Sequence, residues 1–411
     1  MAQETIMFEQ AILGPEEGWG THPPFRCDMM LEPFRLERYF AQYEFKARYL
    51  LCSSDCETMS VDELLSLEPE ARQRLSSLRL GYTEPPGSPS LRQAIAETYA
   101  AIGPEEVVVH SGAEEAIFLF MHAALRPGDE LVVHSPCYQS LEEVARGIGC
   151  KVLRWKARPG DWSLDIGELE GLVGPRTKAV VVNTPHNPTG HLMPRSDFKE
   201  LCQIADERGA VLLSDEVYRG SEHDASDRLP AACDLSESAV SLGVMSKTYG
   251  LAGLRIGWVA TRNQAVKEAM GRLKDYTTIC NSAPSELLAE VALHHRERIA
   301  GRNLRIIRDN LSLLDRFFEA RRDQFEWSRP KAGPIAYPRW TEGDVDGFCE
   351  DLVERAGVLL LPGSVYEDLT GRFRIGFGRR NMPEALEALT AYLERRGKPI
   401  SPRNGMDGHG P

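Results

Sequence analysis

Short apolar runs alternate with amphipathic helical patterns through the middle of the chain. Most of these runs are rich in valine and leucine, and turn residues separate them from the helical patterns. The runs lie at 106–110, 130–134, 178–183, 210–214, 239–243 and 255–260, with helical patterns at 113–125 and 195–208. Nearly continuous apolar strands that alternate with helices are typical of a parallel sheet covered on both faces. The pattern therefore predicts an α/β fold built on a doubly wound, mostly parallel sheet.

The regions on either side of this layer have a different pattern. Residues 1–45 show no strand alternation, whereas the last quarter of the chain mixes short strand patterns with helical ones, which is typical of an α+β unit. We predict four parts: an N-terminal arm, a large domain, a small C-terminal α+β domain, and a Pro- and Gly-rich disordered tail. Their expected bounds are 1–45, 46–290, 291–400 and 401–411.

Composition narrows the possible partners. The chain has 48 Lys and Arg against 61 Asp and Glu, for a net charge of −13, which disfavours binding to nucleic acid or to an anionic membrane surface. No apolar run approaches the roughly 20 residues that span a bilayer, and the N-terminus does not resemble a signal peptide. Nine scattered cysteines are typical of reduced thiols, so we expect a cytoplasmic protein. The histidines and cysteines do not have metal-ligand spacing, and no metal is expected.

Polar and reactive residues follow the predicted strands. In a parallel sheet, ligands bind at the carboxyl ends of the strands, where these side chains are expected to meet. They are Gly112, Ala113 and Glu114 after the first run, Tyr138 after the second, Asn187 after the third, Asp215 and Tyr218 after the fourth, and Ser246, Lys247 and Arg255 after the fifth.

This set of residues suits a phosphorylated, planar aldehyde cofactor with a ring nitrogen. A lysine amine forms an imine with an aldehyde. A carboxylate beside the ring nitrogen keeps that nitrogen protonated, so the ring can accept electrons. An arginine and the free N–H groups at a helix start can hold a phosphate.

Several motifs resemble those of the class I/II aminotransferases, which are fold-type I enzymes that depend on pyridoxal 5′-phosphate (PLP). The resemblance covers roughly residues 80–390. The motifs are YTEPPGSPSLRQAIA at 82–96, GAEEA at 112–116, NTPHNPTG at 183–190, SDEVY at 214–218, SKTYGLAGLRIGW at 246–258 and FRIGFG at 373–378.

The resemblance implies three catalytic residues. Lys247 matches the lysine that forms the internal aldimine and then moves the α-proton. Asp215 matches the partner of the ring nitrogen. Tyr218, with Asn187, matches the pair that hydrogen-bonds the 3′-oxygen of the ring.

Other matches imply how cofactor and substrate are held. Tyr138 falls where the family stacks an aromatic side chain on the ring. Arg374, together with Asn187, matches the clamp for the substrate α-carboxylate. The phosphate cradle would comprise Gly112, Ala113, Glu114, Ser246 and Arg255, with Tyr82 reaching it from a neighbouring subunit, which implies a homodimer.

Two departures from the family bear on the reaction. Val244 stands where the family usually has Ser or Thr, and the first 80 residues match no general family motif. We therefore expect an aminotransferase that moves the α-amino group of an amino acid to a keto acid, with a PLP-dependent lyase, cyclase or β/γ-replacement enzyme as the alternative.

Two further classes are disfavoured by the sequence. A PLP-binding regulator needs a DNA-binding module, but residues 1–80 are neither basic nor of helix-turn-helix pattern. A nicotinamide enzyme of the Rossmann type is disfavoured because no G-x-G-x-x-G follows the early strand.

Overall fold

The computed structural model describes residues 31–396. The predicted tail at 401–411 and the first 30 residues of the predicted arm lie outside the described residues. The predicted boundaries of the large and small domains stay a prediction.

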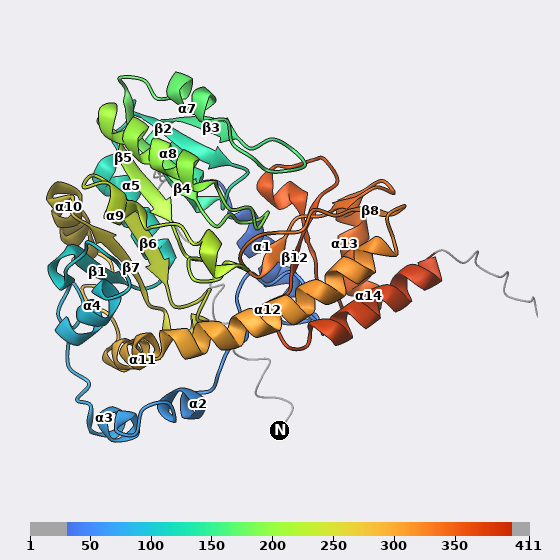
Figure 1. Cartoon of the computed structure of the whole chain (residues 1–411), viewed down its shortest axis with the longest axis horizontal. Coiled ribbons are helices and arrows are strands. Elements are labelled where there is room, and N and C mark those ends of the chain that lie inside the picture. The colour runs from blue at the N-terminus through green and yellow to red at the C-terminus, as the bar shows by residue number, and fades with distance from the viewer. Residues whose placement is uncertain (1–30, 397–411) are drawn as a thin grey trace, which may run out of the picture. The chain divides into compact units, whose positions relative to one another are not determined.

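A seven-stranded sheet forms the centre of the fold (Figure 1). Its strand order is β1-β7-β6-β5-β4-β2-β3. The strands from β2 to β6 pair in parallel, which confirms the predicted mostly parallel sheet. β7 runs antiparallel to both β6 and β1, a detail that the apolar pattern did not predict. The strands are β1 (Val107–His110), β2 (Glu130–Ser135), β3 (Lys151–Lys156), β4 (Thr177–Asn183), β5 (Val211–Asp215), β6 (Val240–Val244) and β7 (Gly257–Thr261).

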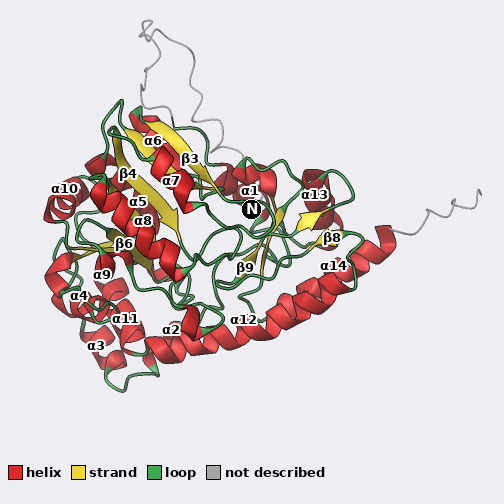
Figure 2. Ribbon diagram, turned by 45° about the horizontal axis from the view of Figure 1, so that its top comes forward, coloured by secondary structure: helices red, strands yellow, loops and turns green. Residues whose placement is uncertain are grey.

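Helices cover both faces of this sheet (Figure 2). Alternate residues of a strand point to opposite faces, so Val132 and Val180 pack with α7 and α8. Leu131 and Val181 pack on the other face with α5, α6 and α10. The helices are α5 (Ala113–Ala124), α6 (Ser140–Ile148), α7 (Ile166–Leu172), α8 (Arg195–Glu207) and α10 (Gln264–Lys274).

Further helices pack at the β1 end of the sheet. Val107 and Val109 of β1 share an apolar cluster with α4 (Pro89–Ala96) and α11 (Ala283–His294). The remaining short elements are α2 (Val61–Leu65), α3 (Ala71–Ser77), α9 (Ala232–Leu235), η1 (Pro104–Glu106), η2 (Ala225–Asp227) and η3 (Ala252–Leu254).

The C-terminal part contains two small antiparallel sheets with helices beside them, in agreement with the predicted α+β pattern. The apolar run GVLLL at 357–361 is one of the short strand patterns of the last quarter, but only Leu361 belongs to a strand, and Val358 forms an isolated bridge with Tyr49. The elements are β8 (Phe325–Glu326), β9 (Ile335–Ala336), β10 (Arg339–Trp340), α13 (Val345–Ala356), β11 (Leu361–Pro362), η4 (Gly363–Tyr366), β12 (Phe373–Gly376) and α14 (Met382–Arg396).

One long helix and one N-terminal segment connect the large and small sheets. α12 (Arg296–Glu319) follows α11 in the chain, and it contacts α14 of the C-terminal part (Figure 1). α1 (Arg35–Tyr43) touches both sides: the Arg35 amide donates to Gln139 Oε1, and the Tyr39 hydroxyl donates to the Leu360 carbonyl. Residues 35–43 therefore lie at the junction between the seven-stranded sheet and the C-terminal part.

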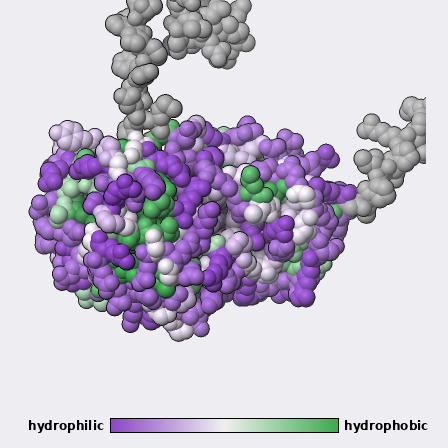
Figure 3. All heavy atoms as spheres, turned by 90° about the horizontal axis from the view of Figure 1, so that it is seen from above, coloured by the Kyte–Doolittle hydropathy of each residue, from purple (hydrophilic) through white to green (hydrophobic). Residues whose placement is uncertain are grey.

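The face shown in Figure 3 is mainly hydrophilic, and apolar side chains occur in separate smaller areas. Among residues 31–396, no helix combines the length and the apolar character that crossing a membrane requires.

Candidate active site

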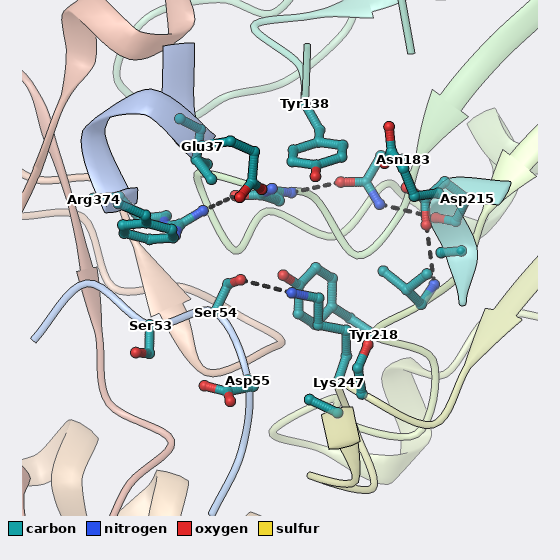
Figure 4. A pocket seen from close by; sticks show the side chains of 18 of the residues that line it. Glu37, Ser53, Ser54, Asp55, Tyr138, Asn183, Asp215, Tyr218, Lys247 and Arg374 are labelled. Atoms are coloured by element: carbon teal, nitrogen blue, oxygen red, sulfur yellow. Dashed lines mark hydrogen bonds between the residues drawn. The ribbon is translucent and has the colours of Figure 1, made fainter. Parts of the chain in front are cut away.

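A cavity of about 360 Å³ lies at the carboxyl ends of β4, β5 and β6. Here the seven-stranded sheet meets α1 and the three-stranded sheet of the C-terminal part, which contains β12. Figure 4 shows this pocket from close by. Ten of the predicted site residues line this cavity: Ala113, Glu114, Tyr138, Asn187, Asp215, Tyr218, Ser246, Lys247, Arg255 and Arg374.

Lys247 enters the pocket from the loop after β6. Its Nζ donates a hydrogen bond to Ser54 Oγ at 2.8 Å (Figure 4). Gly250 lies in the same loop with a φ of +69°, and a Cβ there would clash with the Glu57 carbonyl oxygen. Only a glycine therefore lets this loop pack so closely against the segment that carries Ser54. Burial lowers the pKa of Lys247 below its ordinary value. A lysine amine with a lowered pKa is a better nucleophile and base near neutral pH.

Asp215 is the last residue of β5 and is buried at the base of the pocket. It lies beside Asn183 of β4 in the sheet register, and Asn183 Nδ2 donates to its backbone carbonyl at 2.9 Å. The Val217 amide donates to Asp215 Oδ1 at 3.2 Å. Burial raises the pKa of Asp215 to about 7. A cation placed against this carboxylate would favour its ionised form.

Tyr218 has an unsatisfied polar atom on the pocket wall. The side chain is 2% exposed, and its hydroxyl has no hydrogen-bond partner among the described residues. Buried polar groups are nearly always paired, so an unpaired hydroxyl in a cavity indicates a ligand position.

Gly112 and Arg255 form a cradle at the start of α5. Gly112 has a φ of +85°, and a Cβ there would lie 2.6 Å from Arg255 Nη2. The missing side chain lets the guanidinium approach the backbone at the helix N-terminus, where free N–H groups and the helix dipole favour an anion. Ala113 lies at the first position of the helix, whereas Val244 is buried in β6 and offers no hydroxyl to this cradle.

Arg374 of β12 is buried and linked to Asn187. Its Nη1 donates to Asn187 Oδ1 at 3.1 Å and to the Tyr366 hydroxyl at 2.7 Å, while its Nε donates to the Cys52 carbonyl at 3.0 Å. These bonds orient the guanidinium without using Nη2, so one side of the fork stays available to a carboxylate.

The loop that carries Asn187 is held by its own hydrogen bonds. The Asn187 amide donates to Asn183 Oδ1 at 2.7 Å, and the Gly190 amide donates to the His186 carbonyl at 2.8 Å. Gly190 has a φ of +67°, and a Cβ there would lie 2.6 Å from the Ile335 carbonyl oxygen. The glycine therefore lets this loop pack closely against the C-terminal part.

Glu114 and Tyr82 differ in where the structure places them. Glu114 lines the pocket, and burial raises the pKa of its side chain to about 7. Tyr82 is 91% exposed and does not line the pocket of its own chain. Its predicted role toward a neighbouring subunit stays a prediction.

Sequence reasoning missed several pocket residues of the N-terminal segment, one residue within the motif at 183–190 and one directly after the motif at 373–378. These are Glu37, Glu44, Ser53, Ser54, Asp55, Asn183 and Arg379. Asn183 stands at the end of its strand run and was visible there as a candidate. The others carry no local motif. The acidic face of α1, with carboxylates at 37 and 44, is the only signal that the sequence offers for them.

Comparison with known proteins identifies the family. The family model "Aminotransferase class I and II" matches residues 49–389. Capreomycidine synthase from Streptomyces vinaceus is 34% identical over 372 residues, which cover 89% of this chain and 93% of that protein.

Solved structures agree with this identification. A PLP-dependent aminotransferase from Streptococcus suis 89-1591 is 31% identical with a TM-score of 0.84, covering 90% of this chain and 99% of that one. The PLP-dependent cyclase OrfR is 30% identical with a TM-score of 0.82, covering 93% of this chain and 99% of that one. The predicted fold class is confirmed.

The pocket has features that fit PLP. A cationic ring nitrogen would match the buried Asp215 carboxylate, and the cofactor oxygen would give the Tyr218 hydroxyl a partner. Among the described residues no group of His, Cys, Asp or Glu side chains has the arrangement of a metal site. The chain belongs to the class I and II aminotransferases, with the fold-type I architecture and pyridoxal 5′-phosphate as cofactor.

Proposed function

We propose that this protein is a PLP-dependent aminotransferase that transfers the α-amino group of an amino acid to a keto acid. The observation that carries the proposal is the meeting of Lys247, Asp215 and Arg374 in one cavity. A base, a carboxylate for the ring nitrogen and a clamp for an α-carboxylate are the parts that this chemistry requires.

Bound PLP supplies an electron sink for the electron pair that remains at the α-carbon when the proton leaves. The cradle of Gly112, Ala113, Glu114, Ser246 and Arg255 would hold its phosphate. Asp215 would keep the ring nitrogen protonated. Tyr218 and Asn187 would donate to the ring oxygen, and Tyr138 would stack on the ring.

Arg374 would hold the substrate α-carboxylate, with Asn187 fixing the orientation of the guanidinium. This contact places the α-carbon of the substrate in a defined position relative to Lys247. Lys247 Nζ would take the proton from the α-carbon and deliver it to the C4′ carbon of the cofactor. Its lowered pKa supports this role, because a larger fraction of the amine is neutral at a given pH.

A second candidate is a PLP-dependent cyclase, in which the same α-proton removal leads to ring closure in the substrate instead of amino transfer. Two similarities support it: the relative that is 34% identical is a synthase, and OrfR is a cyclase. Both candidates use Lys247 in the first step and differ only in the later steps.

One experiment separates these outcomes. Purified protein is mixed with single amino acids while its visible absorbance is recorded, and the products are identified by mass spectrometry. Transfer gives a keto acid and a bleached visible band that a second keto acid restores. Ring closure gives a cyclic amino acid while the band is retained. Turnover by Lys247→Ala protein would contradict both candidates.

We propose in addition that the protein is a homodimer. Four of the exposed large apolar side chains lie in two neighbouring segments: Leu80, Tyr82, Tyr276 and Ile279 are 83%, 91%, 92% and 50% exposed. Their segments lie together, because Thr83 Oγ1 donates to the Asn281 carbonyl at 3.1 Å. A second copy of the chain would cover them and bring Tyr82 to the neighbouring phosphate site.

Light scattering tests the dimer. We expect twice the 45.9 kDa mass of one chain, and a shift toward one chain mass for the double variant Tyr82→Ala, Tyr276→Ala. A wild-type protein with the mass of one chain would contradict the dimer.

A cytoplasmic location stays a prediction; it is supported by the eight described cysteines, which are all free thiols.

A further inference from the structure

The wall of the pocket that α1 forms is acidic. Glu37, Phe40 and Glu44 are spaced by three and four residues, so they share one face of this helical segment, and all three line the cavity. Figure 4 shows Glu37 directed from α1 to the side of the pocket where Arg374 and Tyr138 lie. Asp55, from the segment after α1, lines the same wall.

Most charged groups of the pocket already have a counter-charge or a proposed one. Asp55 is paired with Arg379, which donates to both carboxylate oxygens at 2.9 and 3.0 Å. Arg255 faces the proposed phosphate site, Arg374 the substrate carboxylate, and Asp215 the ring nitrogen.

Three carboxylates are exceptions, but one of them, Glu114, accepts a hydrogen bond from Ser140 Oγ at 3.2 Å. Neither Glu37 nor Glu44 makes a hydrogen bond or an ion pair with another side chain in the part of the chain that the structure describes, and both line the cavity. Burial raises the pKa of Glu44, and the charges of Glu37 and Asp55 add to this effect, whereas the nearby Arg379 opposes it. A raised carboxylate pKa means that an added cation would be favoured at this wall.

The cavity itself indicates that a ligand binds beside these carboxylates. The unpaired, 2% exposed hydroxyl of Tyr218 also lines this cavity, and Arg374 lies on the side toward which Glu37 is directed (Figure 4). Leu36 and Phe40 lie on the same wall as Glu37 and offer an apolar surface. This arrangement suits an apolar stem that ends in a positive charge.

We propose that the substrate is an amino acid whose side chain ends in a guanidinium or ammonium group, and that Glu37 and Glu44 bind this cation. The proposal rests on the proposed function, since the α-carboxylate must be held at Arg374. It also implies that dicarboxylic amino acids are poor substrates, because their second carboxylate would face Glu37 and Glu44, while the nearby Arg379 is already bound to Asp55.

The test compares amino acids of similar shape that differ in charge. L-arginine and L-citrulline have side chains of nearly equal size, but only arginine carries a cation. L-lysine presents an ammonium, and L-glutamate carries the opposite charge. Each is titrated into the PLP-loaded protein while the visible band is recorded. Calorimetry with the 2-hydroxy analogue of arginine, which lacks the α-amino group, measures binding without reaction.

We expect arginine or lysine to bind about tenfold more tightly than citrulline, because partly exposed charge pairs contribute about 1 kcal/mol or less each. Glutamate should bind more weakly than citrulline. A stronger response to arginine than to lysine would identify the guanidinium as the preferred cation, and the reverse order would identify the ammonium.

Variants locate the effect. Glu37→Gln and Glu44→Gln should each lower the preference for arginine over citrulline about threefold, so that the two changes together remove the expected tenfold preference. The control is Glu32→Gln, because Glu32 belongs to the same segment but does not line the pocket. An unchanged intensity of the visible band shows that each variant still folds and binds PLP.

Two results overturn the proposal. Equal affinity for arginine and citrulline would do so, as would an unchanged preference in the double variant Glu37→Gln, Glu44→Gln. In both cases other amino acids still shift the visible band, so the proposed function survives. If no amino acid shifts the band of the wild-type protein, the proposed function fails, and this inference fails with it.

Discussion

Lys247 Nζ donates a hydrogen bond to Ser54 Oγ at 2.8 Å, although the two residues are 193 positions apart in the sequence. The lysine comes from the loop after β6, and the serine from the segment that follows α1. The proposed base is therefore oriented by a residue outside the motifs of its own loop. A hydroxyl at this distance restricts the rotamers of a long, flexible side chain, which has an entropic cost when it is ordered.

Replacing Ser54 tests whether this contact positions the lysine. We expect Ser54→Ala to lower kcat about tenfold with little change in KM, because a hydrogen bond to a charged or reacting group contributes about 1.5 kcal/mol. Ser54→Thr keeps the hydroxyl and should recover most of the rate. Ser76→Ala, which removes an exposed hydroxyl on α3, is the control. A tenfold rise in KM with unchanged kcat would contradict the positioning role.

The glycine at the start of α5 gives a prediction about cofactor affinity. Gly112→Ala adds a Cβ 2.6 Å from Arg255 Nη2 at a φ of +85°, so both the backbone and the guanidinium must shift. We expect PLP affinity to fall about tenfold or more, as for the loss of one charge-assisted contact. Equilibrium dialysis of cofactor-free protein with PLP measures the change.

A second glycine provides the comparison for this substitution. Gly171 lies in α7, and a Cβ there meets no atom within 4 Å. Gly171→Ala should leave PLP affinity unchanged and leave stability the same or slightly higher. Equal PLP affinities of the two alanine variants would show that the cradle at Gly112 does not bind the phosphate.

Asp215 predicts how the stability of the cofactor-free protein depends on pH. Its pKa is raised from 3.8 to about 7 by burial, so the folded state favours the protonated form. The contribution of Asp215 to the free energy of unfolding is therefore complete below pH 4 and is lost as the pH rises toward 7. The slope from this one group is at most about 1.4 kcal/mol per pH unit.

Urea unfolding of cofactor-free protein at pH 5, 6 and 7 measures this dependence. The wild-type protein should lose more free energy of unfolding over this range than Asp215→Asn, whose amide does not titrate. Added PLP should reduce the difference in slope, because a protonated ring nitrogen pairs with the carboxylate. Parallel curves for the two cofactor-free proteins would mean that Asp215 titrates at its ordinary pKa.

The Asp55–Arg379 pair predicts an energetic coupling between the N-terminal segment and the C-terminal part. Arg379 binds both oxygens of Asp55, and the side chains of Arg379 and Asp55 are 33% and 21% exposed. In a double-mutant cycle with Asp55→Asn and Arg379→Gln, we expect a coupling of about 1 kcal/mol in the free energy of unfolding. Strictly additive single effects would show that the pair contributes nothing measurable.

The sequence predicted the central sheet because its strands are apolar and its helices are amphipathic. It did not predict that β7 is antiparallel to its neighbours, since a strand buried on both faces has the same apolar pattern in either direction. The short strands of the C-terminal part were predicted less well. Val358 was expected in a strand of its own run, but it bridges to Tyr49, which is more than 300 positions away.

The site shows the same division between local and distant information. Lys247, Asp215 and Asn187 lie in short motifs directly after strands, so their position follows from local sequence. Tyr366 and Ser54 have no such motif. Tyr366 meets Arg374 through the folding of the C-terminal part, and Ser54 reaches Lys247 only when the segment after α1 packs against the loop that follows β6. Tertiary packing of this kind leaves no periodic signal in one sequence.

The residues proposed to select the substrate and those proposed to catalyse the reaction come from separate stretches of the sequence. The groups proposed to carry out the chemistry lie between residues 112 and 255 and at 374, whereas the acidic wall belongs to a stretch of about 20 residues near the N-terminus. Evolution can therefore exchange the preferred amino acid by altering this short stretch while the catalytic groups remain intact. A chimaera that carries residues 31–57 of a relative would inherit that relative's preference.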